Sequence, residues 1–213
     1  MTQKLSKTYI LRIRWKWIIE EALFDRLYHI LSNAKIDFMK LYFARHGQTD
    51  GNASNGKATV IYDEPLNEKG IEQAEDLAKE LKDIKFDAII SSPLKRAYQT
   101  AEIINKYHNL PIKASDTWLE RKADSYIDAN IWQDLFDFDK NIQIENGESL
   151  NDFFDRIYEA IDNLKNEFAG KSVLVVSHGG PQHALYSYAN KLPLSGDMRI
   201  SPMRNCEYRL YEL

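Results

Sequence analysis

The sequence lacks paired cysteines, long apolar runs and a large excess of charge of either sign. Cys206 is the single cysteine among 213 residues, which excludes an internal disulfide and fits a cytoplasmic location. No apolar stretch approaches the ~18 residues of a membrane span, and the N-terminus lacks the apolar core of a signal peptide. A net charge of −4 gives no reason to expect nucleic acid or an anionic membrane as a partner.

What the sequence does contain fits one globular domain preceded by an extension. Hydrophobic residues make up 44% and charged residues 28% of the chain, enough for a sizeable core. Residues 1–38 carry 7 Lys and Arg against 4 Asp and Glu, whereas residues 39–213 carry 21 against 28. We therefore predict an N-terminal helical extension over residues 1–38 and a single domain over residues 39–213.

Apolar residues recur at helical spacing within residues 15–31 and predict one amphipathic helix. Such a helix has three uses: packing on its own domain, contacting a partner or a second copy, or lying on a membrane surface. Translation starting at Met39, directly before the first predicted strand, is a fourth alternative.

From Met39 onward, predicted strands alternate with predicted helices. This order favours an α/β three-layer sandwich with a mostly parallel central sheet and helices on both faces. The predicted strands are 40–44, 86–90, a short one at Ile112, 173–176 and 206–211. The predicted helices begin after the caps Asn67, Ser92 and Ser149, and at Pro181.

Two of these strands end in a histidine followed by glycine. Arg45-His46-Gly47 closes the first strand, and Ser177-His178-Gly179-Gly180 closes a later one. Because parallel strands end at one edge of a sheet, both imidazoles are expected there, where open α/β sheets bind ligands. Imidazoles beside an arginine suit a phosphate dianion, and glycine lets the backbone approach it.

Three further groups are candidates for binding phosphoryl oxygens. Asn52 and the Thr49 hydroxyl follow His46 closely and can both donate hydrogen bonds. Arg96 is expected in the first turn of a helix that begins at the sheet edge, so its guanidinium and the helix N-terminus would face the same anion.

Taken together, these motifs resemble the histidine phosphatase superfamily, with its phosphoglycerate-mutase-like fold. The resemblance extends from about Met39 to the C-terminus. It includes the two histidine motifs and the segments Pro65–Gly70, Ser91–Ala97, Leu119-Glu120, Gly147-Glu148-Ser149 and Asn205-Cys206.

The resemblance implies that His46 is transiently phosphorylated and that Arg45, Arg96 and His178 bind the phosphoryl group. Glu120 is then the proton donor and acceptor, although spacing alone would not single it out among 32 acidic residues. The resemblance implies no metal and no organic cofactor. Two positions depart from the family pattern: Arg121–Tyr126 replaces a stretch containing a Glu-Gly pair, and His183 stands where many members have arginine.

The expected activity is hydrolysis of a small phosphorylated metabolite by a phosphomonoesterase. The segment between Glu120 and His178 is short, and its first part is acidic and aromatic, which disfavours a second phosphate because like charges repel. Bisphosphoglycerate-dependent phosphoglycerate mutase is the alternative, and a non-catalytic interaction protein on the same fold is a third hypothesis. The acidic, aromatic segment is either a lid that governs specificity or an ordinary surface insertion.

Overall fold

Five strands form one sheet, in the spatial order β3-β2-β4-β1-β5. Their bounds are β1 Lys40–Arg45, β2 Ala88–Ser91, β3 Ile112–Ala114, β4 Ser172–Ser177 and β5 Tyr208–Glu212. Strands β1 to β4 pair in parallel, and β5 pairs antiparallel with β1 at one edge. The predicted mostly parallel sheet is therefore confirmed.

This computed structural model describes residues 37–54, 63–122, 134–140 and 142–213. The helix predicted over residues 15–31 lies outside the described residues, as does the stretch 123–133 of the acidic, aromatic segment. Among the described residues, no helix is both long and apolar enough to cross a membrane.

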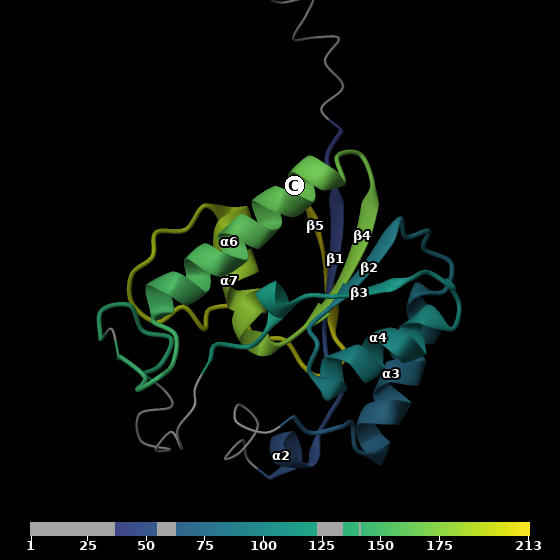
Figure 1. Ribbon diagram of the computed structural model, residues 1–213, viewed down its shortest axis with the longest axis horizontal. Helices are drawn as coiled ribbons and strands as arrows, with labels where there is room; N and C mark the ends of the chain where they lie inside the picture. Colours follow the sequence, from purple (N-terminus) through teal and green to yellow (C-terminus); the bar gives the residue numbers. More distant parts are fainter. Residues whose placement is uncertain (1–36, 55–62, 123–133, 141) are drawn as a thin grey trace, which may run out of the picture. The chain divides into compact units, whose positions relative to one another are not determined.

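Helices cover both faces of the sheet, as Figure 1 shows. The larger helices are α3 Glu68–Leu81, α4 Lys95–Asn105, α6 Leu150–Glu167 and α7 Gly179–Asn190; α2 Asp50–Ala53 and the 3-10 turn η1 Asp116–Trp118 are short. Along β4, Val173 and Val175 belong to the core under α6 and α7, whereas Leu174 and Val176 belong to the core under α3 and α4. Successive side chains point to opposite faces of a strand, so this continuous apolar run fills two cores.

Side-chain caps explain where two of the helices begin. The Asn67 side chain accepts a hydrogen bond from the Gly70 amide at 2.8 Å before α3, and Ser149 accepts one from the Asp152 amide at 3.0 Å before α6. Both caps were predicted, because short polar side chains satisfy amides that the first helical turn leaves unpaired.

The predicted start of α4 at Ser92 is wrong. The helix begins at Lys95, its N-cap residue is Leu94, and no side chain caps it. The Ser92 hydroxyl lies 3.4 Å from the Leu94 amide but also 2.8 Å from a ring nitrogen of His178. Ser92 and Pro93 therefore belong to the connection between β2 and α4, not to the helix.

The starts of β2 and β5 also differ from the predicted ones. Phe86 precedes β2 and packs its ring edge-on against Tyr42 instead of pairing in the sheet. Cys206 precedes β5 with a φ of +54°, a left-handed conformation that turns the chain before the strand begins.

The strand register places the functional motifs side by side. Arg45 of β1 is opposite Ser177 of β4, and Ser91 of β2 is opposite Val176. The three central strands therefore end together, and His46, His178 and Ser92 each follow directly at that edge.

Candidate active site

His46 is buried, with 3% of its surface exposed, and its ring is held in one orientation. Its Nδ1 lies 2.7 Å from the carbonyl oxygen of Gly47. Because a carbonyl can only accept, Nδ1 carries the hydrogen and Nε2 keeps a lone pair. The His46 carbonyl accepts a hydrogen bond from Asn205 Nδ2 at 2.9 Å, which anchors the loop to the C-terminal segment.

Gly47 is needed because the neighbouring backbone leaves no room for a side chain. A Cβ at this position would lie 2.5 Å from the carbonyl oxygen of Gly70. This close approach locks the His46 loop against the start of α3.

His178 faces His46 from the end of β4, with the ring centroids 5.1 Å apart. His178 Nε2 lies 2.8 Å from the Ser92 hydroxyl, while its buried Nδ1 has no hydrogen-bond partner among the described residues. The histidines therefore form a pair, and Ser92 holds the second ring.

Two arginines accompany this pair, Arg45 half-buried and Arg96 buried. Arg45 donates from Nη1 to the Met203 carbonyl at 2.6 Å, and its Nε is buried without a partner in the described part of the chain. Arg96, 2% exposed, lies in the first turn of α4 as expected. However, the Lys95 amide of that helix donates to Asp63 at 2.6 Å, so this amide is not available to a ligand.

Burial and the arginine charges set the protonation of the histidines. Burial, followed by the charges of Arg96 and Arg45, lowers the pKa of His46 well below its usual value. Burial and Arg96 likewise lower the pKa of His178. Both imidazoles are neutral at pH 7, which gives His46 Nε2 the lone pair that a nucleophile needs.

Burial also lowers the pKa of both guanidinium groups, and the Glu120 carboxylate is the first group to oppose this shift in each. Arginine stays charged even so. The Arg45 and Arg96 cations, with an Arg45 Nε and a His178 Nδ1 that have no partner among the described residues, are suited to bind a tetrahedral oxyanion such as phosphate.

Glu120 reaches the same edge from the segment after η1. Its Oε2 accepts a hydrogen bond from the Gly180 amide at 3.1 Å, and its Oε1 accepts one from the Arg121 amide at 3.1 Å. A Cβ at Gly180 would lie only 1.9 Å from Oε1. Gly180 thus makes room for the Glu120 carboxyl group.

The remaining predicted residues have mixed placements. Thr49 and Asn52 form a capping box around α2, with the Thr49 hydroxyl accepting from the Asn52 amide at 3.2 Å. Asn52 Oδ1 also accepts from Asn205 at 3.2 Å, so Asn52 is tied to the His46 loop. Gly179 lies beside Arg45: a Cβ there would be 4.0 Å from the guanidinium. Their binding of substrate stays a prediction.

Sequence reasoning missed Ser92 as a contact of His178. Ser92 directly follows β2 in the sequence, but this position indicates a contact with His178 only when β2 is known to pair with β4. Arg156 was missed as well; it belongs to a polar network around the Glu120 segment that is described below.

His183 is buried beside the site, with its ring centroid 5.9 Å from that of Phe136. Burial, and then the Arg45 charge, lower the pKa of His183 to about 4. It is therefore neutral at pH 7 and adds no cation to the site.

This lowered pKa predicts a pH dependence of stability. Between pH 4 and the ordinary histidine pKa of about 6.5, the unfolded chain binds a proton that folded His183 does not, so stability falls as pH falls. From pH 7 to pH 5 the His183 share of this loss is about 2 kcal/mol. Urea unfolding at both pH values should show a loss smaller by about that amount in His183→Gln; an equal loss in both proteins would show that His183 is not buried neutral.

Comparisons with known proteins identify the family of this chain. The sequence model of the histidine phosphatase superfamily (branch 1) matches residues 41–213. An uncharacterized phosphatase, PhoE of Bacillus subtilis, is 38% identical over 141 residues, covering 66% of this chain and 72% of PhoE. Phosphoserine phosphatase 1 of Hydrogenobacter thermophilus is 30% identical over 164 residues, covering 70% of this chain and 74% of the relative.

A solved structure shows the same fold. The mycobacterial glucosyl-3-phosphoglycerate phosphatase in complex with VO3 superposes with a TM-score of 0.70 at 26% identity, covering 80% of this chain and 90% of that one. The family match spans the sheet and its two histidine motifs. The chain belongs to the histidine phosphatase superfamily, branch 1.

Proposed function

We propose that this protein is a phosphomonoesterase that releases inorganic phosphate from a small phosphorylated metabolite through a phosphohistidine at His46. The observation that carries the proposal is the His46 imidazole itself. Its Nδ1 is committed to the Gly47 carbonyl, its ring faces His178, and Arg45 and Arg96 act on it electrostatically.

In the first step, His46 Nε2 attacks phosphorus and forms an N–P bond while the ester P–O bond breaks. Arg45, Arg96 and His178 bind the phosphoryl oxygens and stabilise their charge in the transition state. The Glu120 carboxyl gives its proton to the leaving alkoxide, because an alcohol is a far better leaving group than its anion.

In the second step, water attacks the phosphorus and the N–P bond breaks. The Glu120 carboxylate, now without its proton, takes one from the water and is ready for the next cycle. Inorganic phosphate leaves, and His46 returns to its neutral form. Thr49, Asn52 and the Gly179 amide are proposed to assist phosphate binding.

The described residues favour hydrolysis over phosphate exchange. A mutase needs a second anion site, yet Arg121 donates to the backbone carbonyls of Glu148, Leu135 and Ile142. Asp137 and Asp139 add negative charge to the nearby segment, in which Asp134 is paired with Lys140. The substrate class, a small phosphorylated metabolite, is in keeping with the named activities of the phosphoserine and glucosyl-3-phosphoglycerate phosphatases.

A panel of p-nitrophenyl phosphate, phosphoserine and 3-phosphoglycerate tests this proposal. We expect net release of inorganic phosphate from at least one ester, and no dependence on added bisphosphoglycerate. Interconversion of 2- and 3-phosphoglycerate that requires bisphosphoglycerate, with little phosphate released, would identify a mutase instead. No turnover in either assay would favour the interaction protein.

The remaining predictions concern the domain boundaries, the N-terminal extension and the location of the protein. We propose that residues 39–213 form the catalytic domain and that residues 15–31 of the extension contact a partner or a second copy. The cytoplasmic location likewise stays a proposal.

A further inference from the structure

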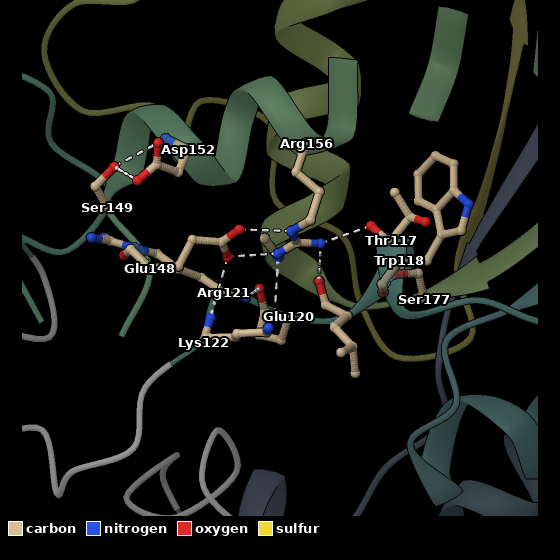
Figure 2. A network of polar contacts seen from close by, with 12 residues as sticks. Thr117, Trp118, Glu120, Arg121, Lys122, Glu148, Ser149, Asp152, Arg156 and Ser177 are labelled. Carbon is tan, nitrogen blue, oxygen red and sulfur yellow. Dashed lines mark hydrogen bonds and ion pairs between the residues drawn. The ribbon is translucent and has the colours of Figure 1, made fainter. Parts of the chain in front are cut away.

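Arg156 and Glu148 form a largely buried ion pair beside the segment that carries Glu120 (Figure 2). Arg156 Nε donates to Glu148 Oε1 at 2.7 Å and Nη2 donates to Oε2 at 2.6 Å. The side chains are only 19% and 11% exposed, whereas every other ion pair among the described residues has at least one partner exposed by a third or more. Solvent therefore screens this pair less than the others.

The Arg156 guanidinium also holds the chain just before Glu120. Its Nη1 donates to the carbonyl of Thr117 at 2.7 Å and to that of Leu119 at 3.2 Å. Figure 2 shows the Arg156 side chain extending from α6 between Glu148 on one side and Thr117 on the other. Four of the five N–H groups of this guanidinium are engaged in this way, so Arg156 is committed mainly to Glu148 and to the chain before Glu120.

Glu148 holds the chain just after Glu120. Its backbone amide donates to the Lys122 carbonyl at 3.1 Å, and its Oε2 accepts a hydrogen bond from the Lys122 amide at 3.4 Å. The ion pair therefore links Leu119 and Lys122, which flank Glu120 and Arg121 in sequence, to the start of α6.

We propose that Arg156 and Glu148 are positioning residues for Glu120, holding its carboxyl where it can protonate the leaving oxygen. The inference rests on the proposed role of Glu120 in the reaction. A general acid works only within hydrogen-bond reach of the oxygen it protonates, and a displacement of about 1 Å can cost about a hundredfold in rate. A planar guanidinium suits this task because it binds a carboxylate with two parallel bonds and still has donors for carbonyls.

The test compares two esters that differ in their need for an acid. An alkyl ester leaves as a strongly basic alkoxide and needs the proton, whereas p-nitrophenolate leaves readily without one. The value of kcat/KM covers only the steps up to the first irreversible one, so phosphohistidine hydrolysis, which both esters share, does not mask the difference. The alkyl ester is the one that the wild-type enzyme hydrolyses fastest in the panel above.

For Arg156→Met we expect kcat/KM to fall at least about tenfold for the alkyl ester and less than about threefold for p-nitrophenyl phosphate. Lys165→Met is the matched control: Lys165 lies on the same helix but contacts Asp162 and Tyr188. Equal losses for both esters in Arg156→Met would overturn the proposal, because a general loss of structure or of phosphate binding affects both.

Two milder variants separate geometry from charge and cover the case in which Arg156→Met does not fold. Arg156→Lys keeps the positive charge but cannot form the paired bonds, and Glu148→Gln keeps the shape of the carboxylate. We expect the same selective loss in both. Wild-type selectivity in Arg156→Lys would mean that the charge alone acts, which contradicts a positioning role.

The double variant with Glu120→Gln decides whether Arg156 acts through Glu120. If it does, Arg156→Met adds less than about twofold to the alkyl-ester loss of Glu120→Gln; multiplicative losses would refute the inference. Glu120→Gln alone tells the two failures apart. If Glu120→Gln shows no selective loss for the alkyl ester, the proposed role of Glu120 fails. If Glu120→Gln shows this loss but Arg156→Met does not, only the positioning role fails.

Discussion

Replacing His46 with alanine is expected to lower kcat for phosphate release by at least about a thousandfold. The variant removes the nitrogen that forms the bond to phosphorus, so no covalent route remains. The measurement is steady-state phosphate release from p-nitrophenyl phosphate. The backbone of the site should survive the change, because it is held by contacts such as Asn205 to the His46 carbonyl and by the close packing of Gly47 on Gly70.

His108→Gln is the matched control for this loss. His108 is a half-buried histidine whose pKa is likewise lowered by burial, but it packs against Phe86 just beyond the C-terminal end of α4. It should keep most of the activity. Equal turnover by wild type and His46→Ala would mean that another site or a contaminant releases the phosphate.

Gly180→Ala is expected to slow hydrolysis of an alkyl phosphate more than that of p-nitrophenyl phosphate, almost as selectively as removal of the Glu120 carboxyl group. The added Cβ would lie 1.9 Å from Glu120 Oε1, so the carboxylate must move and its bond from the Gly180 amide is strained. We expect kcat/KM for an alkyl phosphate to fall by about a hundredfold. The loss for p-nitrophenyl phosphate should be smaller, because that ester does not need the acid.

Gly179→Ala makes the same chemical change one residue earlier in α7. Its Cβ would approach only the Arg45 guanidinium, at 4.0 Å, which is an ordinary contact, and the alanine keeps the backbone amide. We expect a loss of less than about tenfold, with no preference between the two esters. Equal damage from both alanines would show that the helix start, rather than the Glu120 carboxyl, is sensitive to substitution.

The placement of both histidines at one edge of the sheet could be predicted, because each placement depends on one strand at a time. Leu41–Ala44 and Val173–Val176 are apolar runs that end in Arg45-His46 and Ser177-His178. Parallel strands end at a common edge, so these two local patterns place both histidines at that edge. Their direct proximity depends in addition on the pairing of β1 with β4.

Features that depend on strand order or on distant loops could not be predicted in this way. Ser92 appeared to be a helix cap, because Ser-Pro before a helix is a common start, and its contact with His178 depends on β2 pairing with β4. Glu120 could be chosen only by resemblance, since no periodicity brings residue 120 to the Gly180 amide. Arg156 lies on a regular amphipathic helix, where a polar residue is normally read as solvent-facing.

The most direct test of the account is to quench the reaction during turnover under alkaline conditions, which preserve the phosphorus–nitrogen bond, and to locate phosphate by mass spectrometry. A phosphorylated imidazole is expected at His46 in the wild-type protein, and none in His46→Ala. Phosphate on another residue, or turnover with no covalent adduct at all, would contradict it.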